Sequence, residues 1–167
     1  RFEKVTAEHG CVVSYIHGGG RIGVIVEADT DVVNDAVKEC LSNVAMQVAA
    51  LAPKYVATAD VPEEYKEHEK EILMAQAQND PKNANKPANI IEKMISGRLA
   101  KELKEVCLLE QAYVKDGDLT VAKYVEQVAK ENGAALSIKK FVRFETGEGL
   151  EKKVDDFAAE VAAQAGL

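Results

Sequence analysis

The chain has 167 residues, of which 47% are hydrophobic and 29% charged, and its formal net charge is −7. This length and composition indicate a folded domain rather than a disordered segment, and the acidic balance disfavours a nucleic-acid partner, because each bound phosphate needs a Lys or Arg side chain. No apolar run is long enough for a membrane span, so we expect no membrane partner and a cytoplasmic location, or an organelle matrix if the source is organellar.

The first 29 residues are rich in β-formers and are interrupted twice by glycine. They predict three antiparallel strands, over residues 1–8, 11–17 and 21–28. Turns separate these strands at His9-Gly10 and at the glycine triplet that follows His17. The chain therefore begins as a small sheet.

A helical pattern follows the strands, with apolar residues at three- and four-residue spacing from Val33 to Ala49. Thr30 or Asp31 is a suitable N-cap, and Pro53 ends the helix. A helix with so wide an apolar stripe is expected to cover one face of the sheet.

Two further helical segments flank a polar turn at residues 79–87. The first begins near Asp60 and consists mostly of Glu, Lys and Gln, so it cannot lie in a core. The second carries an apolar stripe formed by Ile91, Ile95, Leu99 and Leu103. Residues 60–106 therefore predict an inserted antiparallel helical hairpin, whose stripe packs within the hairpin or pairs with a second copy of the chain.

The sheet resumes after the hairpin. Thr120 caps a short helix, and a strand follows over residues 135–145. In that strand Ile138, Val142 and Phe144 alternate with polar neighbours, apart from Lys140. An amphipathic helix closes the chain.

These elements define an α+β fold: a small antiparallel sheet of about three to four strands covered by helices. We expect three parts. They are a sheet-and-helix core of residues 1–59 plus 107–147, the hairpin of residues 60–106 and a C-terminal helix module of residues 148–167.

The position of the glycine triplet decides between two kinds of loop. A phosphate-binding loop needs glycines that end a strand and open a helix, whereas these glycines lead into the strand that begins at Arg21. A hairpin turn explains all three. His17 before them and Arg21 after them, with bare backbone between, also suit a tip that another protein contacts.

Neither catalysis nor metal binding is indicated. The three histidines lie in separate elements, without the spacing of a zinc site. The three cysteines are odd in number and far apart, which predicts free thiols in a reducing compartment. We expect no enzyme activity, no metal and no cofactor.

Four stretches in unbroken order resemble the elongation factor Ts family, the nucleotide-exchange factors of elongation factor Tu. They are SYIHGGGRIGVIVE, VAMQVAALAPKYV, IIEKMISGRLAKELKEVCLLEQAYV and FVRFETGEGLEKKVDDFAAEVA. The family's architecture matches the prediction above: a sheet subdomain flanked by helices, an inserted coiled-coil hairpin and a C-terminal helix module.

The resemblance implies a protein partner and the residues that meet it. The tip is then part of the surface that contacts domain 3 of elongation factor Tu, through His17, Gly18, Gly19 and Arg21. The C-terminal helix, with Phe157 and Val161, packs on the nucleotide-binding domain of that partner or on the chain's own core.

One departure from the family affects the expected activity. The family's first half holds an N-terminal helical domain and a second sheet subdomain with a Thr-Asp-Phe-Val motif, whose aromatic residue reaches toward the partner's Mg²⁺ site. This chain carries no such motif and begins at Arg1, so we expect a C-terminal half that grips elongation factor Tu and exchanges nucleotide poorly.

Two rival hypotheses stay open. In the first, the chain is a self-assembly module that forms a homodimer through the hairpin, without exchange activity. In the second, it is an RNA-binding ribosomal module, which its acidic balance disfavours.

Overall fold

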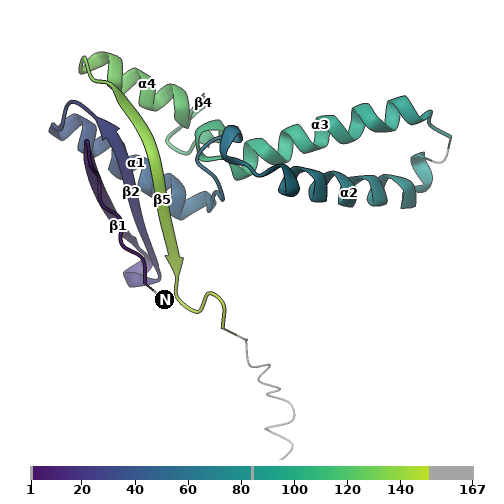
Figure 1. Cartoon of the computed structure of the whole chain (residues 1–167), viewed down its shortest axis with the longest axis horizontal. Coiled ribbons are helices and arrows are strands. Elements are labelled where there is room, and N and C mark those ends of the chain that lie inside the picture. The colour runs from purple at the N-terminus through teal and green to yellow at the C-terminus, as the bar shows by residue number, and fades with distance from the viewer. Residues whose placement is uncertain (1, 84, 151–167) are drawn as a thin grey trace, which may run out of the picture.

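The computed structural model describes residues 2–83 and 85–150 of the chain. Its main sheet is antiparallel, with the strand order β1-β2-β5 (Figure 1). The strands are β1 (Cys11–His17), β2 (Ile22–Thr30) and β5 (Leu136–Glu145). The α+β class with a small antiparallel sheet is therefore confirmed, and the sheet brings together segments from the two ends of the described chain.

Two helices, α1 (Asp35–Leu51) and α4 (Val121–Glu131), cover the same face of this sheet. Alternation along β2 directs Val24, Val26 and Ala28 toward them, and all three side chains are buried. We call this covered side the inner face. The core is completed by fully buried residues of α1, namely Val37, Leu41, Val44 and Val48.

Helix α1 begins later than the sequence predicted. Its N-cap is Asn34, whose Oδ1 accepts a hydrogen bond from the backbone N–H of Val37 at 2.9 Å. Thr30 is the last residue of β2, and its hydroxyl donates to the carbonyl of Val32 at 3.0 Å. The predicted caps Thr30 and Asp31 are therefore wrong, because the strand runs two residues further than its composition indicated.

The predicted strand over residues 1–8 is also wrong, since residues 2–10 form no strand. Gly10 has a φ of 104° and lies so close to β2 that a Cβ there would overlap the carbonyl oxygen of Ala28 and lie 2.8 Å from the N of Thr30. Regular pairing with the sheet starts only after this glycine, at Cys11.

A β-bulge in β5 changes which side chains face the helices. Glu27 lies opposite Lys140, but Ala28 lies opposite Ile138, so Lys139 is an extra residue. Ile138 consequently lies on the inner face, whereas Val142 and Phe144 lie on the opposite, outer face, across from Ile25 and Gly23. The predicted alternation of Ile138, Val142 and Phe144 on one face is corrected by this bulge.

The helices α2 (Glu63–Asn79) and α3 (Ala88–Val106) form an antiparallel hairpin that projects away from the sheet (Figure 1). It is attached through two neighbouring segments of chain. The backbone N–H groups of Lys54 and Tyr55 donate to the carbonyl of Val106 at 2.8 and 3.1 Å, and the N–H of Leu108 donates to the carbonyl of Tyr55 at 2.9 Å. The hairpin therefore leaves and re-enters the core at one place.

A short two-stranded ribbon, β3 (Ala112–Tyr113) and β4 (Asp116–Thr120), connects the hairpin to α4. The sequence pattern did not predict this ribbon. It did predict the N-cap that follows, where the Thr120 hydroxyl accepts from the N–H of Lys123 at 3.3 Å.

Candidate partner-binding surface

The β1–β2 hairpin ends in a glycine turn at the opposite end of the sheet from the start of α1. Gly18, Gly19 and Gly20 have φ values of 60°, 65° and 97°, and the N–H of Arg21 closes the turn on the carbonyl of Gly18 at 3.4 Å. Positive φ costs a residue with a side chain about 1–3 kcal/mol, so this backbone path favours glycine at all three positions. The turn leads into β2 rather than into a helix, so it lacks the helix N-terminus of a phosphate site.

Two polar side chains flank the glycines, and residues 17–21 together are called the tip. His17 is exposed, its ring stacks on Tyr15 with centroids 6.0 Å apart, and its Nδ1 lies 3.1 Å from the Tyr15 hydroxyl. This contact orients the ring and leaves Nε2 for a partner. Arg21 is exposed, and among the ion pairs of the described residues none involves its guanidinium.

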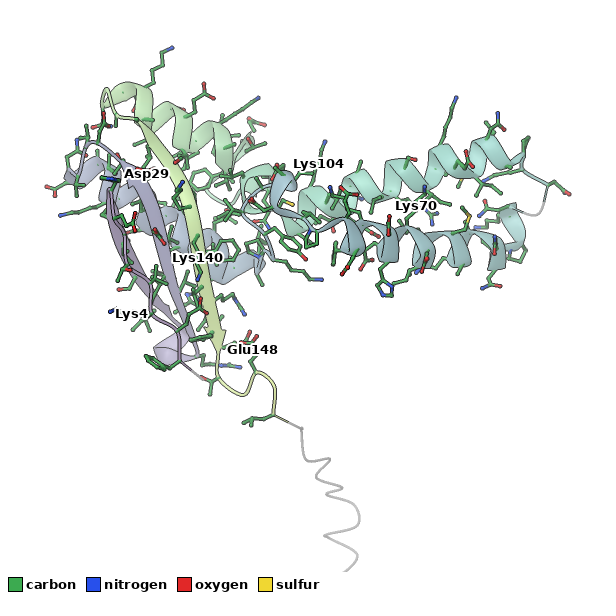
Figure 2. The ribbon with its side chains drawn as sticks, in the orientation of Figure 1. Lys4, Asp29, Lys70, Lys104, Lys140 and Glu148 are labelled. Carbon is green, nitrogen blue, oxygen red and sulfur yellow. The ribbon has the colours of Figure 1, made fainter. Side chains whose placement is uncertain are left out.

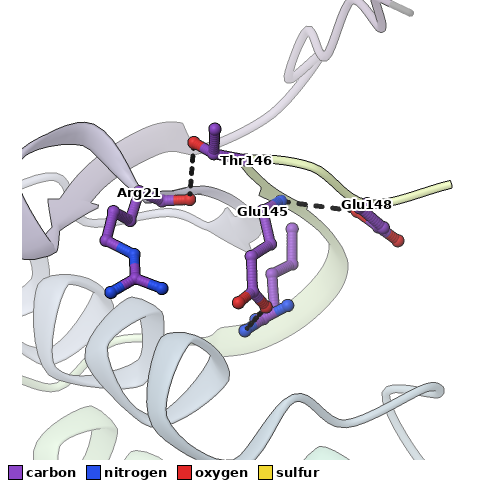
Figure 3. A network of polar contacts seen from close by, with 5 residues as sticks. Arg21, Glu145, Thr146 and Glu148 are labelled. Atoms are coloured by element: carbon purple, nitrogen blue, oxygen red, sulfur yellow. Dashed lines mark hydrogen bonds and ion pairs between the residues drawn. The ribbon is translucent and has the colours of Figure 1, made fainter. Parts of the chain in front are cut away.

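The chain just after β5 holds the tip from the side (Figure 3). The backbone N–H of Thr146 donates to the carbonyl of Arg21 at 2.8 Å, and its hydroxyl lies 3.2 Å from that oxygen and 3.4 Å from the carbonyl of Gly20. Glu148 closes the turn that follows, with its N–H donating to the carbonyl of Glu145 at 3.1 Å. The tip and the turn of residues 146–150 are therefore one hydrogen-bonded unit.

Comparison with known proteins identifies the family. The family model of elongation factor TS matches residues 1–148. The chain belongs to the elongation factor Ts family. The resemblance drawn from its four sequence stretches is thus confirmed.

Individual members of the elongation factor Ts family match this chain over nearly its whole length. Elongation factor Ts of Clostridium botulinum (strain Eklund 17B / Type B) is 50% identical over 166 residues, which cover 99% of this chain and 54% of the relative. That of Clostridioides difficile (strain 630) is 54% identical over 164 residues, 98% of this chain and 52% of the relative. That of Carboxydothermus hydrogenoformans is 53% identical over 161 residues, 94% of this chain and 72% of the relative. The chain thus spans about half the length of the first two relatives.

The predicted apolar stripe of α3 lies mostly inside the helical hairpin. Ile95 is only 1% exposed and packs with Leu73 and Ala77 of α2, and Ile91 and Leu99 border the same cluster. Leu103 is half-buried near the end of α3. Packing within the hairpin accounts for the centre of the predicted stripe.

Two of the predicted contact residues, Phe157 and Val161, lie outside the described residues, as does most of the predicted C-terminal module. The tip residues His17, Gly18 and Arg21 are brought together by the turn. The contribution of Thr146 was not predicted from the sequence, because its bonds to the tip join residues more than 120 positions apart in the chain.

A buried glutamine joins α1 to the ribbon β3–β4, and this too was missed. The Gln47 amide donates to the Gln111 side chain at 3.2 Å and to the carbonyl of Ala112 at 3.0 Å, and its Oε1 accepts from the N–H of Val114 at 2.9 Å. The sequence did hold a sign of this contact, because Gln47 is a polar residue on the apolar stripe of α1. A fully buried amide needs hydrogen-bond partners.

A second polar cluster lies beside it. The Asn43 amide donates to the Tyr124 hydroxyl at 2.8 Å, and Lys115 Nζ donates to Asn43 Oδ1 at 2.7 Å. Tyr124 stacks on Tyr113 with ring centroids 4.2 Å apart. Burial raises the pKa of the Cys40 thiol to about 11, and it also raises the pKa of the Tyr113 hydroxyl. These groups stay protonated at neutral pH, so they stabilise the core and supply no nucleophile.

Within residues 2–83 and 85–150, no group of three or more His, Cys, Asp or Glu side chains is arranged to hold a metal ion. In the same part of the chain, no helix is both long and apolar enough to cross a membrane. The feature that stands out is the exposed tip, where three glycines without side chains suit close contact with another protein surface.

Proposed function

We propose that the chain binds elongation factor Tu through the tip, as the gripping part of a factor that promotes release of guanine nucleotide. The observation that carries the proposal is the run of three glycines with positive φ, Gly18, Gly19 and Gly20, which His17 and Arg21 flank and Thr146 holds in place. Membership of the elongation factor Ts family supports the identity of the partner.

The proposed activity is a coupling between two ligands of elongation factor Tu. If the factor weakens the affinity for nucleotide by some ratio, nucleotide must weaken the affinity for the factor by the same ratio. Each tenfold weakening of the affinity for nucleotide requires the factor to bind the nucleotide-releasing state of elongation factor Tu more tightly by about 1.4 kcal/mol. Contacts that bind both states equally supply affinity and no exchange.

The tip is expected to supply affinity, because hydrogen bonds hold its backbone and Gly18, Gly19 and Gly20 carry no side chain. By the family resemblance, distortion of the nucleotide site belongs to the Thr-Asp-Phe-Val motif, which is not in this sequence. We therefore expect this chain to bind elongation factor Tu and to accelerate nucleotide release weakly. We assign it to the compartment of protein synthesis, the cytoplasm or an organelle matrix.

The test measures binding and exchange separately. Release of a fluorescent GDP analogue from elongation factor Tu is followed after excess chain is added, and the two proteins are also titrated against each other by calorimetry. His17→Ala removes the ring at the tip, and His68→Ala is the matched control, since His68 is also an exposed histidine and lies on α2. We expect binding that His17→Ala weakens and His68→Ala leaves unchanged. An unsubstituted chain that fails to bind contradicts the proposal.

Self-association through the hairpin is the second candidate function. It would use apolar side chains that the internal packing leaves on the surface, Ile72 at 37% and Ile90 at 40% exposure. Sedimentation over a concentration series separates the two functions, because a chain that stays monomeric at high concentration excludes self-pairing.

A further inference from the structure

The most exposed apolar side chains of the described residues gather at the tip end of the sheet. Leu150 is 75% exposed and Ile16 is 72% exposed, whereas Val33, away from this end, is 49% exposed. Ile16 immediately precedes His17, and Leu150 ends the turn that holds the tip. Phe2 is 91% exposed, and the N-terminal end of the chain lies beside the same end of the sheet (Figure 1).

The exposure of Ile16 has a specific cause. Ile16 lies on the outer face of the edge strand β1, directly opposite Gly23 of β2. A glycine supplies no cross-strand side chain, and the space where its Cβ would stand is empty within 4 Å. Ile16 therefore has no side chain directly opposite it on β2.

Leu150 has a defined place relative to the tip, although it comes after the last strand. Its N–H donates to the carbonyl of Gly147 at 3.2 Å, and Gly147 and Gly149 have φ values of 86° and 76°. The turn so formed is joined to Arg21 by the 2.8 Å bond from the N–H of Thr146. Figure 2 shows Glu148 of this turn just beyond the end of β5, whereas Lys70 and Lys104 lie on the distant hairpin.

We propose that Ile16 and Leu150 are apolar contacts on either side of the tip, and that with Arg21 they form one surface for elongation factor Tu. This inference rests on the proposed function. Backbone hydrogen bonds of β1 and of the 146–150 turn set the positions of Ile16 and Leu150. The matching surface of the partner is then an apolar patch with a carboxylate facing Arg21, whose guanidinium forms no ion pair among the described residues.

The test titrates the chain into elongation factor Tu by isothermal calorimetry. Ile16→Thr keeps the β-branched shape suited to a strand and removes apolar surface, and Leu150→Gln keeps the length of the side chain. Each is expected to raise Kd about tenfold, which is about 1.4 kcal/mol. Val114→Thr is the matched control, because Val114 is 46% exposed but lies between β3 and β4. All three variants are expected to unfold at the temperature of the unsubstituted chain.

The outcomes separate this inference from the function on which it rests. If His17→Ala weakens binding while Ile16→Thr or Leu150→Gln binds like the unsubstituted chain, the larger surface is refuted and the proposed function stands. Weakening by Val114→Thr to the same degree also overturns the inference, since the effect is then not specific to the tip. If the unsubstituted chain does not bind, the proposed function itself fails.

Discussion

Replacement of Gly10 by alanine tests how closely the start of β1 approaches the central strand. A Cβ on Gly10 would overlap the carbonyl oxygen of Ala28 and lie 2.8 Å from the N of Thr30, both backbone atoms of β2. Neither atom moves without shifting the strand. Gly20 has a similar φ, 97° against 104°, but a Cβ there meets nothing within 4 Å. Gly20→Ala is therefore the matched control, because it carries the backbone strain without the overlap.

The two variants should differ by the cost of the overlap alone. Strain at positive φ is about 1–3 kcal/mol for each variant. Forcing a methyl group into a packed site adds about 1–3 kcal/mol. We therefore expect Gly20→Ala to lower the free energy of unfolding by about 1–3 kcal/mol and Gly10→Ala by about 2–6 kcal/mol. Against a typical total of about 5–15 kcal/mol, the second loss is severe.

The assay is urea unfolding followed by near-ultraviolet circular dichroism. The chain has no tryptophan, so this signal comes mainly from its tyrosines. Among these, the stacked pair Tyr113 and Tyr124 lies against the same core as β2. If the two variants lose the same free energy, the close approach at Gly10 has no energetic consequence and the reasoning is refuted.

Three further predictions concern the hairpin, the tip and the core. Asn83→Ala removes the 3.0 Å hydrogen bond from the Asn83 amide to a carbonyl in the last turn of α2. It is expected to destabilise the hairpin by about 1–2 kcal/mol, measured by limited proteolysis. Asn85→Ala, at an exposed neighbouring position, should leave the stability unchanged. Arg21→Gln should weaken binding to elongation factor Tu about threefold to tenfold and reduce the dependence of binding on salt. Arg98→Gln on the hairpin should change neither. An unchanged salt dependence for Arg21→Gln contradicts a carboxylate of the partner that faces Arg21. Burial raises the pKa of the Cys40 thiol from 9.0 to about 11, so its contribution to stability is complete below pH 9 and is lost as the pH rises toward 11. Cys40→Val should make the fall in unfolding free energy between pH 9 and 11 less steep, and an identical slope would show that the thiol does not titrate as proposed.

The sequence predicted elements whose signals are local. The Thr120 cap lies next to the helix it starts, and the apolar spacing that runs through Ile95 spans one helix. The glycine triplet was correctly placed between two strands, because positive φ values are a property of the residues themselves.

The missed features depend on residues far apart in the chain. The bulge at Lys139 exists because β5 must match β2, which is more than 100 residues away, and no local pattern reports that register. The bonds of Thr146 to the tip and of Gln47 to Gln111 are of the same kind. The strand expected over residues 1–8 shows the converse error, since β-forming composition without a partner strand gives no sheet.

The attachment of the hairpin gives it the mechanics of a lever. With 19 residues, α3 is about 28 Å long at 1.5 Å per residue. Its near end is fastened where the chain around Tyr55 runs beside the chain around Cys107. A sideways push on the far turn is therefore delivered as torque to a few backbone hydrogen bonds next to α1 and the ribbon, about 28 Å from where the force is applied.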